Sequence, residues 1–306
     1  MENLRLAFWK AQRGKQGKRE VMVFREDLDA HLSRLREGLL SGDVPIGEYS
    51  YFTINDPKER VICAASFSER VVHHAIMNVC EKEFERYQIF DSYACRKGKG
   101  VDCCLKRMQQ MCGRFAWYLK LDVHKYFDSI SHDILKRLLR RHFKDTDLLL
   151  LFDRIIDSYN VSEGRGIPIG NLTSQFFANM YLGLLDHQVK DVWRNPGYVR
   201  YMDDFVLFFD TREDAKEMLD QVRDFLENEL ALELNQPQLN KTRFGIPALS
   251  YRVFTGHLRL SLKAKRRFKR KMSQAIADGE RERMLPLLSF VERADCLGIK
   301  KKVCIG

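Results

Sequence analysis

Two adjacent carboxylates, Asp203 and Asp204, stand between two apolar segments within residues 198–209. The flanking segments are rich in Val, Phe and Tyr, which favours strands, and a polar break between two such runs indicates a hairpin. Carboxylates held together at the tip of an apolar hairpin repel each other. A hard cation such as Mg²⁺, which takes oxygen ligands, would relieve that repulsion. The alternative is a surface turn with two solvated aspartates, because Asp is common in turns.

A third carboxylate, Asp122, lies near the end of residues 115–123, a mostly apolar, aromatic-rich segment that predicts a buried strand. Sheets in α/β proteins usually place ligand sites at strand ends. Together, Asp122 and Asp203 supply the strand-end carboxylates that a two-metal phosphoryl-transfer site requires. In such a site, ions ~3.5–4 Å apart stabilise the attacking and leaving oxygens. Capping of the next turn is the alternative role for Asp122.

The elements expected to position these aspartates are helices interleaved with strands, which predicts an α+β fold. Apolar residues at helical spacing predict helices at residues 24–40, 69–87, 102–111, 132–143, 148–159, 211–232, 263–277 and 280–295. Alternating or β-branched runs predict further strands at residues 49–54, 60–64, 243–246, 249–255 and 257–262. A Gly- and Pro-rich loop at residues 164–170 leads into a helix that continues toward residue 192.

The charge of the chain indicates a polyanionic partner. The formal net charge is +10, and residues 263–271 read KAKRRFKRK, a run whose mutual repulsion favours a nearby anion. A second basic cluster comprises Lys10, Arg13, Lys15, Lys18 and Arg19. No apolar run is long enough to cross a bilayer and the N-terminus has no apolar leader, so we expect a cytoplasmic protein without a membrane partner.

The eight cysteines include no C-x-x-C pair and no spacing that suits zinc. We therefore expect reduced cysteines, several of them buried as small apolar residues, rather than a metal–thiolate site or a disulfide framework.

Five segments give the chain its resemblance to reverse transcriptases. In chain order they are LKLDVHKYFDSI, which contains Asp122, then GIPIGNLTSQFFANMYL, YMDD, LNKT and SYRVF. They are similar to polymerase motifs A to E, and the resemblance runs from about residue 60 to residue 271. It implies a right-hand polymerase with an N-terminal arm and fingers (1–114), a palm of antiparallel sheet backed by helices (115–256, with fingers elements at about 135–165) and a short helical thumb (257–306).

The resemblance also implies roles for individual residues. Asp122, Asp203, Asp204 and the Val123 carbonyl would bind two Mg²⁺ ions, with Mn²⁺ as a substitute, and Lys241 resembles a lysine that protonates the leaving pyrophosphate. Other implied contacts with the nucleotide come from Arg60, Arg96, Lys97, Phe127, Ile169, Gly170 and Gln175. Among these, Phe127 resembles the steric gate that excludes a ribose 2′-OH. Implied primer or template contacts are Tyr201, Met202, Tyr251, Arg252, Lys265, Arg266 and Lys269.

The loop that carries Arg96 and Lys97 is basic and broken by glycines, so its guanidinium and ammonium groups suit triphosphate oxygens. A solvated basic loop is the equally favoured alternative.

Motif B indicates the subfamily. Ile169 and Gln175 stand where most reverse transcriptases have Gln and Pro, and this version, with the N-terminal AFWKAQRGK, resembles the enzymes of diversity-generating retroelements. Those bacterial or phage-encoded enzymes copy a template-repeat RNA with frequent errors at adenines and work with a small basic accessory protein. The implied partners are therefore template RNA, an RNA–DNA duplex, dNTPs and that accessory protein, in an assembly that can be oligomeric. Ile169 cannot hydrogen-bond near the sugar as Gln can, which would loosen geometric checking.

Two alternatives remain open. The nearer is a retron, defence-associated or group II intron-like reverse transcriptase; the sequence shows no maturase extension and no terminal Cys/His cluster, which counts against a full intron protein. The more distant is a non-catalytic RNA-binding protein on a polymerase scaffold, and the intact Asp122, Asp203 and Lys241 argue against it.

Overall fold

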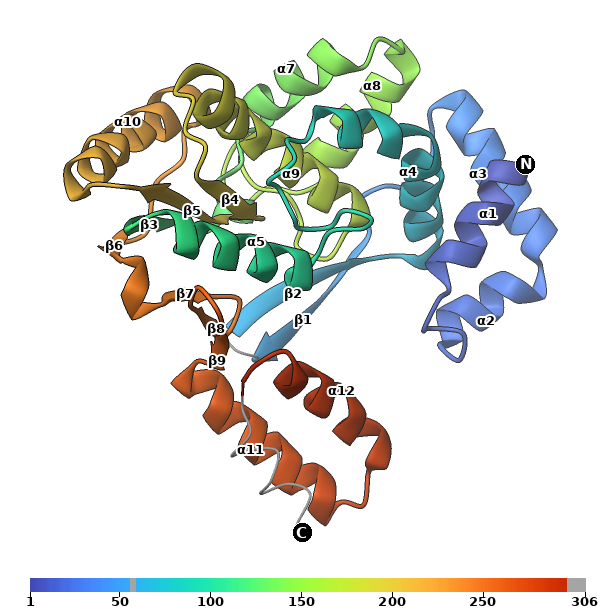
Figure 1. Cartoon of the computed structure of the whole chain (residues 1–306). Helices are drawn as coiled ribbons and strands as arrows, with labels where there is room; N and C mark the ends of the chain where they lie inside the picture. The colour runs from blue at the N-terminus through green and yellow to red at the C-terminus, as the bar shows by residue number, and fades with distance from the viewer. Residues whose placement is uncertain (56–58, 296–306) are drawn as a thin grey trace. The chain divides into compact units, whose positions relative to one another are not determined.

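The computed structural model describes residues 1–55 and 59–295, and the chain divides into two compact units. The first unit comprises Met1–Ile89, His124–Asp186 and Phe225–Glu233, and the second comprises Phe90–Val123, His187–Asp224 and Leu234–Gly306. Both units mix helices with strands, as the predicted α+β class requires (Figure 1). The boundaries of fingers, palm and thumb remain a prediction.

The first unit begins with α1 (Glu2–Ala11), α2 (Arg19–Glu26), α3 (Leu28–Ser41) and the longer α4 (Phe67–Tyr87). The single helix predicted at residues 24–40 is in fact two helices, because Asp27 leaves helical geometry with φ −128° and ψ 57°. Phe8, Phe24 and Phe67 form the centre of this bundle, with ring centroids 5.1–6.0 Å apart. Such aromatic burial fixes the helices more firmly than their local propensities do.

A hairpin of β1 (Tyr49–Asn55) and β2 (Glu59–Ala65) precedes α4, with Tyr49 opposite Ala65 and Ile54 opposite Arg60. Both strands were predicted; their turn at residues 56–58 lies outside the described residues. The side chains of Tyr51, Phe52 and Val61 on this hairpin are exposed.

The rest of the first unit is helical. It contains α6 (Tyr126–Ser129), α7 (His132–His142), α8 (Thr146–Asp157) and α9 (Leu172–His187); the short π-helix η1 (Gln188–Val192) follows in the second unit. Phe84, Phe143, Phe152 and Phe177 gather here, with neighbouring ring centroids 5.1–6.2 Å apart. The predicted helices therefore form around one aromatic core.

The second unit is built on an antiparallel sheet in the order β4-β5-β3-β6, with β3 (Trp117–Asp122) and β5 (Asp204–Phe209) at its centre. Strand β4 (Tyr198–Tyr201) forms the predicted hairpin with β5, and β6 (Gln238–Lys241) pairs with the other edge of β3. Helix α10 (Arg212–Leu230) begins as predicted, because Thr211 Oγ1 accepts a hydrogen bond from Asp214 N at 3.1 Å.

A small sheet of β7 (Ile246–Ala248), β8 (Tyr251–Val253) and β9 (Leu258–Leu260) follows a 3-10 turn, η2 (Thr242–Phe244). The strand predicted at residues 243–246 is wrong, and β6 was not predicted as a strand. β6 has the sequence QLNK, whose polar residues give no alternating hydrophobic pattern. Its backbone nevertheless pairs with β3. Helices α11 (Leu262–Ala277) and α12 (Arg281–Glu292) come last.

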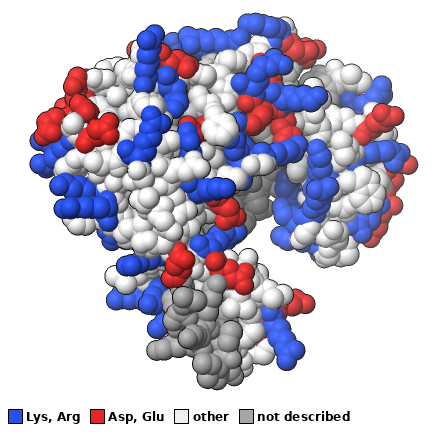
Figure 2. Space-filling model, in the orientation of Figure 1, with Lys and Arg blue, Asp and Glu red and all other residues white. Residues whose placement is uncertain are grey.

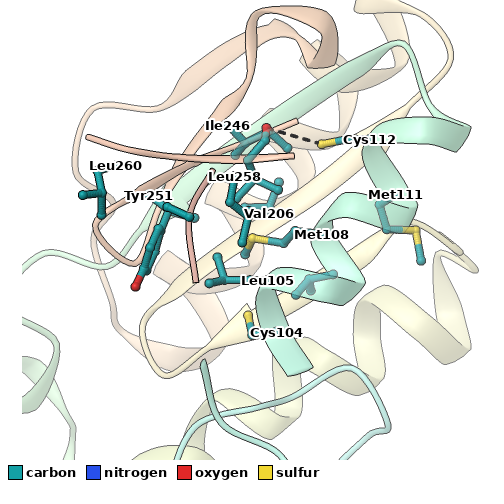
Figure 3. Close-up of a cluster of buried hydrophobic side chains, with 14 of the residues drawn as sticks. Cys104, Leu105, Met108, Met111, Cys112, Val206, Ile246, Tyr251, Leu258 and Leu260 are labelled. Atoms are coloured by element: carbon teal, nitrogen blue, oxygen red, sulfur yellow. Dashed lines mark hydrogen bonds between the residues drawn. The ribbon is translucent and has the colours of Figure 1, made fainter. Parts of the chain in front are cut away.

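The core of the second unit joins the palm-like sheet, α5 (Val101–Arg114) and the small sheet (Figure 3). Tyr118, Val206 and Phe208 share one face of the large sheet, and Leu105 and Met108 of α5 are buried with them in one cluster. Each large side chain buried in this way stabilises the fold by about 1.5–3 kcal/mol. The apolar face therefore holds β3 and β5 in register.

Several of the described cysteines are buried, as the sequence predicts. Cys63, Cys80, Cys104 and Cys112 are buried, and all six described cysteines are free. Burial raises the pKa of Cys80 to about 11 and of Cys112 to about 12, so these thiols stay protonated. Among the described helices, none is both long enough and apolar enough to cross a membrane.

The environment of His74 on α4 predicts that acid destabilises the first unit. Burial lowers its pKa from 6.5 to about 4, and the positive charges of Lys10 and Lys15 add to the effect. The unfolded chain therefore binds more protons between these values, so stability falls as the pH drops from about 6.5 toward 4. We expect His74→Gln to reduce this decline, measured as the free energy of urea unfolding at pH 7 and pH 5. An unchanged decline would show that other groups cause it.

Candidate active site

The turn between β4 and β5 consists of Met202 and Asp203, as Tyr201 pairs directly with Asp204. Met202 has a φ of +58°, and positive φ at only the first central residue is the feature of a type II′ hairpin. A strained backbone conformation of this kind costs a residue with a side chain roughly 1–3 kcal/mol. The fully buried Arg200 stabilises it, because its Nη1 donates to the Met202 carbonyl at 3.0 Å.

Asp122 and Asp204 are directly opposite each other on β3 and β5, so their side chains lie on the same face of the sheet. Lys120, two residues before Asp122, shares that face, and its Nζ is 2.7 Å from Asp204 Oδ1. Burial raises the pKa of the Asp204 carboxyl to about 6; the Lys120 ammonium opposes the rise and the other two aspartates add to it. The strand register thus concentrates negative charge that one lysine only partly balances.

The Val123 backbone connects this pair to the hairpin turn. Val123 N donates to the Asp203 carbonyl at 3.4 Å, which places the predicted motif A and motif C segments side by side. Asn235 also contacts this segment, donating from its side-chain amide to Asp122 Oδ2 at 2.8 Å and to the Val123 carbonyl at 3.3 Å. The sequence prediction missed Asn235, although it lies only six residues before Lys241 in the same polar segment.

These residues suit a hard cation in part. Among the residues that the structure describes, no three His, Cys, Asp or Glu side chains are gathered as a complete metal cluster. The carboxylates of Asp122 and Asp203 and the Val123 carbonyl are oxygen donors of the type that Mg²⁺ takes, on two backbone segments joined by the hydrogen bond from Val123 N to the Asp203 carbonyl. Mg²⁺ commonly takes one or two protein carboxylates and completes its shell with water and substrate phosphates.

Lys241 is not brought to the aspartates. It pairs with Trp117 at the opposite end of β3, and its Nζ lies 5.2 Å from the centre of the Trp117 ring. Asp122 is five residue steps along the strand from Trp117, which corresponds to roughly 17 Å. Proton donation by Lys241 therefore stays a prediction and requires the segment to move.

The first unit brings together Phe127 and the motif B loop. Ile167 N donates to the Phe127 carbonyl at 2.9 Å, and the Phe127 side chain is half-buried on α6. Gln175 lies in the first turn of α9 and is also half-buried. Arg60 lies on β2, but its side chain is outside the described residues.

Gly170 lets the motif B loop touch the β1–β2 hairpin. The Ile169 carbonyl accepts a hydrogen bond from Cys63 N at 2.9 Å. Gly170 has a φ of +127°, and a Cβ there would lie 2.7 Å from the Cys63 carbonyl oxygen. Only glycine therefore fits this contact.

The remaining predicted contacts differ in their exposure. Arg96 Nη1 donates to the Ser92 carbonyl at 2.7 Å, whereas Lys97 is exposed. Tyr251 is only 1% exposed and its hydroxyl donates to the Phe290 carbonyl at 2.8 Å, so its side chain is part of the core. Arg252 on the same strand is exposed.

Helix α11 separates its apolar and basic residues. Ala264, Phe268 and Met272 face the core, whereas the predicted template contacts are exposed: Lys265, Arg266 and Lys269. Figure 2 shows one face of the molecule, on which Lys and Arg side chains are spread among acidic ones. The basic surface of α11 is thus one part of a wider distribution of positive charge.

The five motifs and this carboxylate geometry agree with the comparison to known families. Residues 55–268 match the family described as "Reverse transcriptase (RNA-dependent DNA polymerase)", and the chain belongs to that family. The match confirms the predicted enzyme class.

Two curated relatives are similar to this chain at low identity. Protein YkfC of Escherichia coli (strain K12) is 25% identical over 75% of this chain and 71% of its own length. The group II intron-encoded protein LtrA of Lactococcus lactis subsp. cremoris is 22% identical over 70% of this chain. The chain spans only 48% of LtrA.

Solved structures confirm the fold class. Apo telomerase from Candida tropicalis superposes with a TM-score of 0.53 at 11% identity, covering 76% of this chain and 54% of the telomerase chain. Telomerase from Candida albicans gives a TM-score of 0.51 at 13% identity, with coverages of 89% and 60%. At this identity the likeness concerns the α+β fold alone.

Gly170 generates a prediction about the motif B loop. We expect Gly170→Ala to lower stability by roughly 1–3 kcal/mol, because the backbone conformation is strained and the new Cβ meets the Cys63 carbonyl. Urea unfolding measures the loss, and Gly164→Ala is the matched control because a Cβ there meets nothing within 4 Å despite a φ of +65°. Equal losses for the two variants would contradict the role of the Cys63 contact.

Proposed function

We propose that this chain copies a template-repeat RNA into cDNA for a diversity-generating retroelement, with frequent errors at adenines. The observation that supports the catalytic part is the register of β3 and β5, which sets Asp122 opposite Asp204 beside the Asp203 turn. The observation that supports the mutagenic part is Ile169 and Gln175 in motif B.

In the proposed reaction, the primer 3′-OH attacks the α-phosphorus of a dNTP and pyrophosphate leaves. Asp122, Asp203 and the Val123 carbonyl would hold two Mg²⁺ ions, and Mn²⁺ is a suitable substitute. When bound, such ions activate the attacking hydroxyl and neutralise charge on the leaving group. The protein supplies position: the paired strands fix the Asp122 backbone, and the Arg200-supported turn fixes Asp203.

Substrate selection would depend on the first unit. The Phe127 backbone is held by Ile167 N, which suits a fixed steric gate against a ribose 2′-OH. The Ile169 carbonyl accepts a hydrogen bond from Cys63 N, and the Ile169 side chain has no hydrogen-bonding group that could contact a nucleotide. A loop that is fixed in this way and offers no side-chain hydrogen bond to the nucleotide would discriminate poorly between correct and incorrect base pairs.

The proposed partners are template RNA, the RNA–DNA duplex, dNTPs and a small basic accessory protein. The exposed cations of α11, Lys265, Arg266 and Lys269, would contact duplex phosphates as a thumb does. We place the complex in the cytoplasm of a bacterium. A retron, defence-associated or group II intron-like enzyme is the second candidate, and the similarity to LtrA favours the group II intron-like one.

Asp203 tests the catalytic assignment. Primer extension on an RNA template should require Mg²⁺, and Asp203→Asn should lower its rate at least 10³-fold because an ion loses a charged ligand. Asp210→Asn, on an exposed residue just after β5, is the matched control and should retain activity. Mg²⁺-dependent extension by Asp203→Asn at the wild-type rate would exclude this site.

Ile169 tests the mutagenic assignment. Sequenced cDNA made with the native RNA and the accessory protein should carry errors chiefly opposite template adenines, and Ile169→Gln should lower that error frequency severalfold. Errors spread evenly over the four bases would contradict the retroelement role. An error frequency unchanged in Ile169→Gln would remove Ile169 as the cause.

A further inference from the structure

Asn235 makes an unusual set of contacts with the segment that carries Asp122. Its side-chain Nδ2 donates to Asp122 Oδ2 at 2.8 Å and to the Val123 carbonyl at 3.3 Å. Its backbone N donates to the Asp122 carbonyl at 2.9 Å. One residue therefore contacts the side chain of Asp122, its peptide group and the next carbonyl.

The backbone around Asn235 is fixed on both sides. Leu234 forms an isolated antiparallel bridge with Val123, and Gln238 begins the β6 ladder opposite Lys120. Asn235 thus lies just beyond the end of the β3–β6 pairing, beside Asp122. A half-buried side chain on such a backbone can hold a fixed orientation.

An amide side chain can orient a metal ligand through a hydrogen bond, but it does not neutralise the charge of that ligand. The amide of Asn235 is uncharged, so it holds Oδ2 of Asp122 without placing a positive charge beside the carboxylate. Lys120 differs, because its ammonium places a full positive charge 2.7 Å from Asp204. Metal ligands are commonly oriented by outer hydrogen bonds, whose loss costs 10–100-fold in affinity or activity.

We infer that Asn235 is a positioning residue of the polymerase reaction, which fixes the Asp122 carboxylate and the Val123 carbonyl in the orientation that receives a divalent cation. This inference rests on the proposed function for its meaning, because Asp122 is a metal ligand only in that function.

The test compares Asn235→Ala and Asn235→Leu, which is similar in size to Asn but has no donor, with Gln236→Ala, an exposed neighbour, as the matched control. Mn²⁺ alone is titrated into the full chain and free Mn²⁺ is measured by electron paramagnetic resonance. Both Asn235 variants should weaken Mn²⁺ binding about tenfold, in line with the loss of an outer hydrogen bond to a ligand. Gln236→Ala should bind like the wild type, and Asp122→Asn sets the value for a lost ligand.

Primer extension over a range of Mg²⁺ concentrations supplies the second measurement. Asn235→Ala should need about ten times more Mg²⁺ for half-maximal rate and should regain most of its kcat at saturating Mg²⁺. Reduced activity with an unchanged Mg²⁺ requirement, or unchanged Mn²⁺ binding in both Asn235 variants, would overturn the inference. The melting temperature shows whether Asn235→Ala has lost its fold, in which case Asn235→Leu decides.

The two proposals fail differently. A wild-type chain that binds Mn²⁺ through Asp122 but extends no primer would overturn the proposed function and leave the Asn235 effect on binding measurable. A wild type that extends primers, with Asn235 variants that match it in every metal measurement, would overturn only the inference.

Discussion

The antiparallel pairing of β3 with β5 is the constraint on which the candidate site depends. It sets Asp122 opposite Asp204, and the two-residue turn adds Asp203, so backbone hydrogen bonds force carboxylates together that would otherwise separate. The free energy that holds this register comes from the apolar end of the same strands, where Tyr118, Val206 and Phe208 are buried. The packing of apolar side chains on these strands therefore holds the carboxylates close together despite their electrostatic repulsion.

The side chains next to the three aspartates differ in how they offset the repulsion between the carboxylates. Lys120 places an ammonium against Asp204, whereas Asn235 offers Asp122 only a neutral donor. Arg200 acts through the backbone, where it supports the Met202 carbonyl of the turn. Asp122 therefore has an uncharged donor beside it and the turn backbone is held by Arg200, an arrangement that would suit cations arriving with substrate phosphates.

Much of this arrangement could be predicted from the sequence, because apolar periodicity and motif order are local features. The strand that carries Asp122, the hairpin whose turn carries Asp203 and the cap at Thr211 were predicted correctly. β6 and Asn235 were not, since a polar edge strand has no hydrophobic pattern and a tertiary hydrogen bond has no local signal. Lys241 is far from Asp122 because the register of β6 on β3 pairs Lys241 with Trp117, and a sequence motif does not predict strand register.

The central claim is that Asp122 and Asp203 bind the ions of a polymerase reaction. Anomalous diffraction from Mn²⁺ in crystals of the chain with an RNA template, a DNA primer and an incoming dNTP tests it most directly. The account predicts two peaks ~3.5–4 Å apart, with Asp122, Asp203 and the Val123 carbonyl among their ligands. Peaks bound elsewhere, or a complex with dNTP and primer in place but no peak at Asp122, would contradict it.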